Sequence, residues 1–287
     1  MYKRQVSVST AERLSSNISI LAFLYNAFKI STRWRIPTPR ESIVASGSTF
    51  NSYSIANAFK FILAFCIEEL KNGPSSTPRT TFSKTEKFST NLNESIKKSD
   101  IIFICVGTPT KKGSSSADLS QIYNVAKEIS SSINKFKIVI TKSTVPVTTG
   151  DEIEKILSKK NDKKNFSVVS NPEFLREGEA IRDFRYPDRI IIGSNSKNEF
   201  KIMKKLYSPL INKGAKFFTT SRRGAELIKY AANAFLATKI TFINEIANLC
   251  EKSGINVEDV ALGIGSDSRI GGRFLRPGPA YGGSCFP

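Results

Sequence analysis

Residues 101–106, "IIFICV", decide the fold class of this 287-residue chain. Six consecutive apolar residues, four of them β-branched, are typical of a strand that is buried on both faces of a sheet. Similar runs recur at 136–141 ("FKIVIT"), 166–170 ("FSVVS") and 189–193 ("RIIIG"), and segments with helical periodicity lie between the first three, at 117–133 and 148–160. This alternation of strand and helix predicts an α/β fold with a parallel, doubly wound sheet.

A long helix is predicted after the sheet. Residues 222–254, "RRGAELIKYAANAFLATKITFINEIANLCEKSG", carry apolar side chains at helical spacing, and Gly254 suits the end of a helix. At 1.5 Å per residue this helix would be roughly 45–50 Å long. Such a helix, apolar on more than one side, is typical of a domain connector or a subunit contact. Residues 256–265, "NVEDVALGIG", predict one more short helix.

These patterns divide the chain into three parts: residues 1–86, 87–220 and 221–287. The first part is rich in Ser, Thr and Pro, and no strand is predicted before residue 100. Its one helical candidate is 54–73. The second part is the α/β region, and the third is helical.

Composition restricts the chemistry. The chain has no histidine, which excludes Ser-His and Cys-His catalysis and zinc sites that contain histidine. Acid-base work at neutral pH must then fall to Lys, Asp, Glu, Cys or Tyr. The four cysteines are far apart and form no CxxC pair, so we predict no metal site and a reducing, cytoplasmic setting.

The net charge of +18 comes mostly from scattered lysines. We therefore favour a solvated surface that attracts anionic small molecules over a specific nucleic-acid interface, which remains an alternative. No apolar run approaches the roughly 20 residues that span a membrane.

Three loops follow predicted strands and are rich in hydroxyl, glycine and carboxylate residues: 107–110 ("GTPT"), 142–146 ("KSTVP") and 171–178 ("NPEFLREG"). In an open parallel sheet, ligands bind beyond the carboxyl ends of the strands. The alternative interpretation is ordinary turn chemistry, since Pro, Gly, Thr and Asn are common in loops.

Two further positions carry reactive groups. Lys229 and Asn233 are four residues apart and share a helix face among apolar neighbours, where burial would lower the pKa of the amine. The alternative is that Lys229 extends into solvent. Cys285 follows Gly282 and Gly283, so it is either a nucleophile beside a close backbone approach or one of the many inert cysteines.

Six segments together resemble one protein family: "DIIFICVGTPT", "ADLS", "KSTVPVTTG", "NPEFLREGEAIRDFRYPDRIIIG", "AELIKYAANAFLATKITFINEIANLCE" and "RIGGRFLRPGPAYGGSCFP". In this order they are similar to the nucleotide-sugar dehydrogenases, whose members act on UDP-glucose, GDP-mannose or UDP-N-acetylmannosamine. The resemblance runs from about residue 87 to 287, and "NPEFLREGEAI" with "PDRIIIG" is closer to the UDP-glucose branch. It implies that 87–220 is a partial Rossmann-like dinucleotide-binding domain and that 221–287 is an all-helical central domain.

The resemblance also implies a double oxidation of a UDP-sugar with NAD as cofactor, which takes the alcohol at carbon 6 to a carboxylate. Cys285 matches the nucleophile that forms a thiohemiacetal and then a thioester. Lys229 and Asn233 match the pair that stabilises the oxyanion. Glu173 matches an acid-base residue, and Thr144 matches a threonine that positions water and cofactor.

The remaining site residues are implied in the same way. On the cofactor side they are Thr108, Thr144 and Glu177. On the substrate side they are Glu173, Phe174, Leu175, Lys229, Asn233, Arg269, Phe274, Leu275, Arg276, Pro277, Gly278 and Gly282. Arg269 matches an arginine contributed across a dimer, and the long helix matches the core of a homodimer.

Two departures from the family pattern lead to further expectations. No GxGxxG turn occurs anywhere in the chain, and the sequence ends at "GGSCFP". We therefore expect an incomplete enzyme with little or no activity of its own. Alternatives are a dehydrogenase for another nucleotide sugar and a non-catalytic dimerisation partner.

Overall fold

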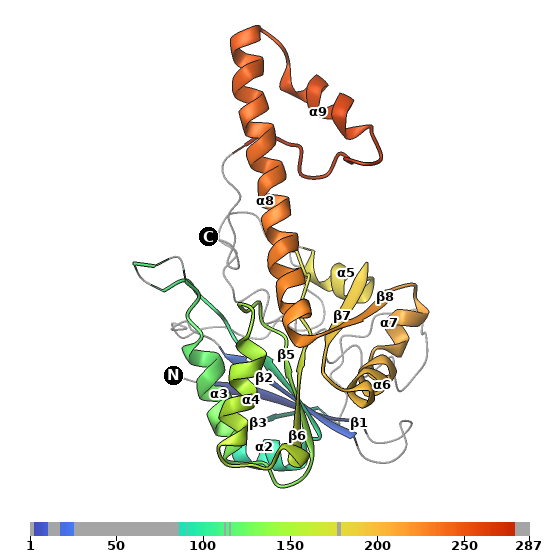
Figure 1. The fold of residues 1–287 in the computed structure, drawn as a ribbon. Helices are drawn as coiled ribbons and strands as arrows, with labels where there is room; N and C mark the ends of the chain where they lie inside the picture. The colour runs from blue at the N-terminus through green and yellow to red at the C-terminus, as the bar shows by residue number, and fades with distance from the viewer. Residues whose placement is uncertain are drawn as a thin grey trace, which may run out of the picture.

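The computed structural model describes residues 3–10, 18–25, 86–89, 91–111, 113–114, 116–176 and 179–278. These contain one eight-stranded sheet with the order β3-β1-β2-β4-β5-β6-β7-β8 (Figure 1). The strands are β1 (Lys3–Thr10), β2 (Ile18–Tyr25), β3 (Glu86–Ser89), β4 (Ile101–Cys105), β5 (Lys137–Thr141), β6 (Phe166–Ser170), β7 (Arg189–Gly193) and β8 (Lys216–Thr220).

The centre of the sheet is parallel, as predicted. Strands β2, β4, β5 and β6 run in one direction, and β8 is parallel to β7. Strand β7 is antiparallel to β6 and pairs with it only at Ser170 and Gly193. The connection between them therefore leaves and re-enters the sheet at the same edge, which the apolar pattern of the two strands could not reveal.

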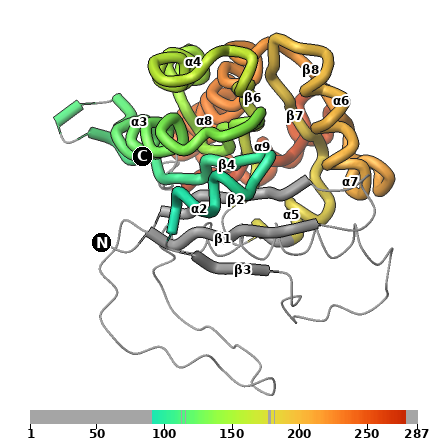
Figure 2. The backbone as a smooth tube through the Cα atoms, turned by 90° about the horizontal axis from the view of Figure 1, so that it is seen from below, coloured from blue at the N-terminus to red at the C-terminus, as the bar shows by residue number. Residues whose placement is uncertain are grey.

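Helices cover both faces of the sheet (Figures 1 and 2). On one face lie α2 (Leu92–Lys98), α3 (Ser120–Ser130) and α4 (Thr149–Ser158), and on the other lie α5 (Ala180–Arg185), α6 (Lys197–Leu206) and α7 (Ser208–Asn212). Alternate residues of β4 enter the two cores: Ile102 and Ile104 pack towards α3 and α4, whereas Ile101 and Phe103 pack towards α6 and α7. This double burial explains the unbroken apolar run at 101–106.

Helix α8 (Arg222–Ser253) has 32 residues, which confirms the predicted long helix. Ser221 caps its first turn by accepting a hydrogen bond from the Gly224 N–H, and Gly254 ends it with φ +67°. Figure 1 shows α8 projecting away from the sheet, with α9 (Val257–Gly265) folding back beside its far end. Among the helices in the described ranges, none is both long and apolar enough to cross a membrane.

A glycine lets α8 begin close to the sheet. A Cβ atom on Gly193 would lie 2.6 Å from Cβ of Ala225 and 2.7 Å from the carbonyl oxygen of Ser221. Both distances are shorter than any ordinary contact between such atoms. The end of β7 and the first turn of α8 therefore pack backbone against backbone.

Several elements were missed from the sequence. Strands β1, β2 and β3 precede residue 100, where no strand was predicted. Helices α2, α5, α6 and α7 and strand β8 were also not predicted. The helical candidate at 54–73 lies outside the described residues. The boundaries of the three predicted parts of the chain stay predictions.

Candidate active site

The loops after β4 and β5 are joined at the carboxyl edge of the sheet. The Thr108 hydroxyl donates a hydrogen bond to the backbone oxygen of Thr144 at 2.9 Å, and the Ser143 hydroxyl donates to the oxygen of Val106 at 2.6 Å. The side chain of Thr144 is buried, with 7% of the residue exposed. Its Oγ1 atom has no hydrogen-bond partner among the described residues. Two residues expected on the cofactor side, Thr108 and Thr144, are thus neighbours.

The loop after β6 carries a carboxylate that faces the long helix. Oε1 of Glu173 lies 3.8 Å from Nζ of Lys229, and the two side chains are only 10% and 7% exposed. The other oxygen of Glu173 accepts a hydrogen bond from the Leu175 N–H at 2.7 Å. Lys229 is buried, so of the two open interpretations the one in which it extends into solvent is wrong.

The ring of Phe174 lies close to two cations. Its ring centroid is 5.2 Å from Nζ of Lys229 and 4.2 Å from the guanidinium carbon of Arg189, which is in the first position of β7. Both distances are within the range in which a cation is attracted to an aromatic face. Phe174 and Leu175 therefore belong to the same cluster as Glu173 and Lys229.

Asn233 follows Lys229 by about one turn of α8 and is half-buried. The two residues share a face of the helix, as predicted from their spacing.

The thiol of Cys105 lies at this edge of the sheet. Burial raises the pKa of Cys105, the last residue of β4; the positive charge of Lys142 opposes this shift and the negative charge of Glu173 adds to it. A thiol with a raised pKa stays protonated at neutral pH and is a poor nucleophile. Cys105 is thus a half-buried, protonated thiol that packs against the apolar core.

The first two turns of α8 bury a charged face that the sequence analysis did not identify. Arg222, Glu226 and Lys229 are all buried and are separated by four and three residues, so they share one side of the helix. The signal was present in the sequence, because charged residues occur at core spacing next to Ala225. Periodicity alone could not show which carboxylates and amides they meet.

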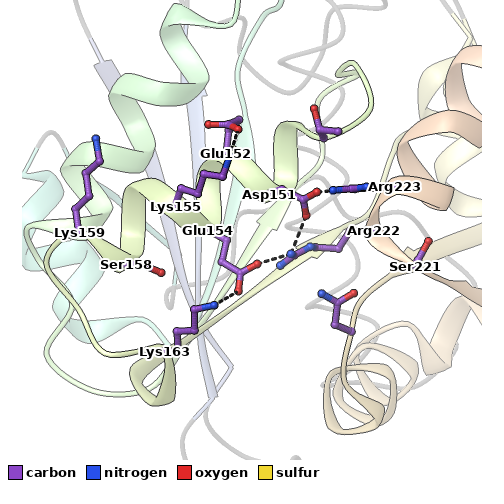
Figure 3. Close-up of a pocket in the computed structure, with 12 residues that line it drawn as sticks. Asp151, Glu152, Glu154, Lys155, Ser158, Lys159, Lys163, Ser221, Arg222 and Arg223 are labelled. Atoms are coloured by element: carbon purple, nitrogen blue, oxygen red, sulfur yellow. Dashed lines mark hydrogen bonds and ion pairs between the residues drawn. The ribbon is translucent and has the colours of Figure 1, made fainter.

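Arg222 connects this face to α4 (Figure 3). Its guanidinium donates to Asp151 at 2.8 Å and to Glu154, and Arg223 donates to Asp151 at 2.7 Å. Burial favours a higher pKa for Asp151, but the hydrogen bonds from Arg223 and Arg222 outweigh it and lower the pKa. Arg222, Asp151 and Glu154 are among the residues that line a surface pocket of about 780 Å³. None of the expected site residues lines this pocket, so it is separate from the Glu173–Lys229 cluster.

The expected substrate loop lies farther along α8. The N–H of Gly278 donates to Oδ1 of Asn244 at 3.0 Å, and Nζ of Lys239 donates to the carbonyl oxygens of Ile270 and Gly271. Asn244 is fifteen residues after Lys229, or about 22 Å along the helix. Within the described part of one chain, this loop therefore does not reach the Glu173–Lys229 cluster.

The expected residues of this loop differ in exposure. Leu275 is buried, Phe274 and Pro277 are half-buried, and Arg269 and Arg276 are exposed. Arg269 pairs with Asp267. Three other expected residues, Glu177, Gly282 and Cys285, lie outside the described residues.

Two family models match the chain. Residues 71–211 match the NAD binding domain of the UDP-glucose/GDP-mannose dehydrogenase family, and residues 223–287 match the central domain of the same family. The two matches together include well over half of the chain. The chain belongs to this family. The match begins at residue 71, earlier than the start near residue 87 that the motifs had indicated.

Relatives within the UDP-glucose/GDP-mannose dehydrogenase family are close. A UDP-glucose 6-dehydrogenase of Rhizobium meliloti is 56% identical over 203 residues, which are 70% of this chain and 46% of the relative. One of Rickettsia felis is 51% identical over 201 residues, which are 70% of this chain and 44% of the relative. The chain thus spans just under half the length of these curated relatives.

Solved structures of the family are also similar. A UDP-glucose dehydrogenase from Pyrobaculum islandicum has a TM-score of 0.70 and 31% identity, with 85% of this chain and 63% of that chain covered. A GDP-mannose dehydrogenase from Pseudomonas aeruginosa, solved as a ternary complex, has a TM-score of 0.57 and 34% identity, with 69% and 47% covered.

Proposed function

We propose that this chain takes part in the NAD-dependent oxidation of UDP-glucose to UDP-glucuronate. The observation that carries the proposal is the buried Glu173–Lys229 pair, which gathers a carboxylate and an amine beside the carboxyl ends of β4, β5 and β6. The names of two curated relatives support UDP-glucose as the substrate.

The residues at the edge of the sheet fit a nicotinamide cofactor. Thr144 offers a buried hydroxyl with no partner among the described residues, at the place where open α/β sheets bind nucleotides. Thr108 holds the backbone of Thr144, and Glu177 is expected beside them. When bound, NAD accepts a hydride from carbon 6 of the sugar in each of the two oxidation steps.

The chain's own groups would supply the rest of the chemistry. The carboxylate of Glu173 would take up the hydroxyl proton as the alcohol becomes an aldehyde, and would return it later in the reaction. Cys285 then adds its sulfur to the aldehyde carbon, and Lys229 and Asn233 stabilise the negative oxygen that develops on that carbon. After the second hydride leaves, water cleaves the resulting thioester, which releases the carboxylate and restores the thiol.

Chain length permits Cys285 to meet Lys229. Cys285 is seven positions after Gly278, which is bound to Asn244, and seven extended residues span at most about 25 Å. Asn244 lies about 22 Å along α8 from Lys229, and its direction around the helix axis is within about 60° of that of Lys229. The thiol can therefore reach the amine along one side of the helix.

The opposite side of α8 supports a homodimer. Leu227, Phe235, Phe242 and Leu249 are 50–65% exposed and recur every seven or eight residues. This spacing places them on one side of the helix, roughly opposite Glu226 and Lys229. A second copy of the chain would cover this apolar stripe, and its Arg269 is expected to complete the substrate site.

The place of the protein in the cell is a separate part of the proposal. The four cysteines are far apart in the sequence, which favours a reducing compartment such as the cytoplasm.

The test is NADH formation by the purified chain with UDP-glucose. We expect two NADH per UDP-glucuronate, at well below about 1 per second because the GxGxxG turn is absent. The rate should become undetectable in Cys285→Ala. NADH formation that does not depend on UDP-glucose, or a product other than the uronate, would overturn the proposal.

GDP-mannose is a second candidate substrate, because the GDP-mannose dehydrogenase of Pseudomonas aeruginosa is 34% identical to the matched part of the chain. Competition between UDP-glucose and GDP-mannose in the same assay separates the two, and preference for GDP-mannose would favour the alternative.

A further inference from the structure

A buried carboxylate, Glu226, joins three segments of the chain. Its residue is only 2% exposed. Oε2 accepts a hydrogen bond from the N–H of Thr148 at 2.8 Å, and Oε1 accepts one from the N–H of Gly150 at 2.8 Å. The hydroxyl of Ser170 also donates to Oε1, at 3.1 Å. Glu226 on α8 thus holds the start of α4 and the end of β6 together.

The turn that Glu226 holds is strained. Thr148 has φ +81°, which is uncommon for a β-branched residue. Gly150 faces the carboxylate so closely that a Cβ atom there would lie 2.9 Å from Oε1 of Glu226. A strained backbone persists only where its surroundings fix it, and the two hydrogen bonds to Glu226 provide that restraint.

The place of this turn in the chain links it to the site residues. Thr148 is four residues after Thr144, and Glu226 is three residues before Lys229. Glu226 is therefore one helix turn from Lys229, and its hydrogen bond from the Thr148 N–H joins it to a residue four positions from Thr144. On the basis of the proposed function, we infer that Glu226 is a positioning residue that sets the Thr144 loop against the Lys229 amine.

Glu226 does not act by touching the reactants. Its two oxygens are occupied by backbone N–H groups and a hydroxyl inside the protein, so its effect on the reaction passes through Thr144 and Lys229. Burial raises the pKa of Glu226, against the hydrogen bonds from Gly150, Ser170 and Thr148, and Asp151 raises it further. The charge of Glu226 also interacts with Tyr123 of α3 and Arg223 of α8.

The experiment compares Glu226→Ala and Glu226→Gln with Arg223→Gln as a matched control. Arg223 lies on the same helix turn and pairs with Asp151 of α4, but its side chain is exposed. The alanine variant loses both acceptors. The glutamine variant keeps one carbonyl oxygen and turns an NH₂ group towards the other N–H, so its effect should be intermediate.

The first readout does not require activity. Hydrogen exchange at Thr148 and Gly150 should become roughly tenfold faster or more in Glu226→Ala, because two buried N–H groups lose a charged acceptor. Acetylation of Lys229 by acetic anhydride, relative to the exposed Lys197, should also increase. Arg223→Gln should leave both quantities within about twofold of wild type. Unchanged exchange, or a uniform acceleration over the whole domain, would overturn the inference.

The second readout is kinetic. If Glu226 positions the reacting groups, kcat for UDP-glucose oxidation should fall at least tenfold in Glu226→Ala while KM changes less than about threefold. Equal losses in the Arg223→Gln control would contradict the inference. If wild type forms no NADH, the proposed function fails, and the exchange and acetylation measurements still decide whether Glu226 fixes the turn and the amine.

Discussion

Lys229 and Glu173 approach to 3.8 Å in a setting where both side chains are almost fully buried. Each charge therefore depends on the other for compensation, because neither is well solvated. Removal of one partner leaves a buried charge without its counterpart, which is costly.

Glu173→Gln or Lys229→Met alone should lower the free energy of unfolding by about 3 kcal/mol. The double variant should cost much less than the sum, because no charge is then left alone. Urea unfolding of the four proteins in the cycle measures this coupling. Strict additivity would show that the two groups do not interact.

The stability of the chain should depend on Lys137 at alkaline pH. Burial, followed by repulsion from Lys135, lowers the pKa of Lys137 from 10.5 to about 8, although its Nζ donates to the carbonyl oxygens of Lys97 and Ser99. Between pH 8 and 10.5 the unfolded chain binds more protons at this residue than the folded chain. The contribution of Lys137 to the free energy of unfolding therefore rises with pH across that window.

The measurement is urea unfolding at several pH values between 7.5 and 10.5. The difference between wild type and Lys137→Met isolates the titration of this amine from that of other groups. Lys197→Met, which removes an exposed lysine that plays no part in the shift of Lys137, serves as the control. A wild-type profile that runs parallel to that of Lys137→Met would contradict the lowered pKa.

Thr148→Gly should be tolerated. Glycine adopts φ +81° without strain, so the substitution removes backbone strain from the folded state. This gain offsets the greater conformational entropy of glycine in the unfolded chain. The free energy of unfolding should therefore stay within about 1 kcal/mol of wild type. Thr149→Gly, at the next residue, should cost about 1–2 kcal/mol, because the buried Thr149 hydroxyl donates to Pro146 O. Thermal unfolding compares the two, and a larger loss for Thr148→Gly would mean that the turn is not strained.

Phe242→Glu should abolish dimer formation if the apolar stripe of α8 is the contact. A charge in the middle of the stripe would have to be buried without a partner. Sedimentation equilibrium gives the mass of each protein. Glu251→Lys changes the charge at an exposed site about 180° around the same helix and should leave the mass unchanged. A monomeric wild type, or a dimeric Phe242→Glu, would contradict the model of assembly.

The sequence predicted the elements with the strongest periodicity. Strands β4, β5 and β6 are buried on both faces, and helices α3, α4, α8 and α9 have clear helical patterns. Strand β8 was missed because it is an edge strand with a half-exposed composition, "KFFTT". Helices α5 and α7 have only six and five residues, too few to show a period.

The sequence predicted only part of the candidate site, and the reason for this limit is physical. Spacing along one helix predicts that Lys229 and Asn233 share a face, since helix geometry is local. The contact of Lys229 with Glu173 and that of Glu226 with Gly150 join residues more than fifty positions apart. Such contacts depend on how the loops after the strands meet α8, which no local pattern contains.

The clamped base of α8 has a mechanical consequence. The helix is about 48 Å long, so a tilt of about 5° at its base would swing its far end by about 4 Å. The backbone contact at Gly193 and the ion pairs of Arg222 resist that tilt. Helix α8 is fixed at the end next to the sheet. The position of any molecule bound at its far end therefore depends on the angle between α8 and the sheet.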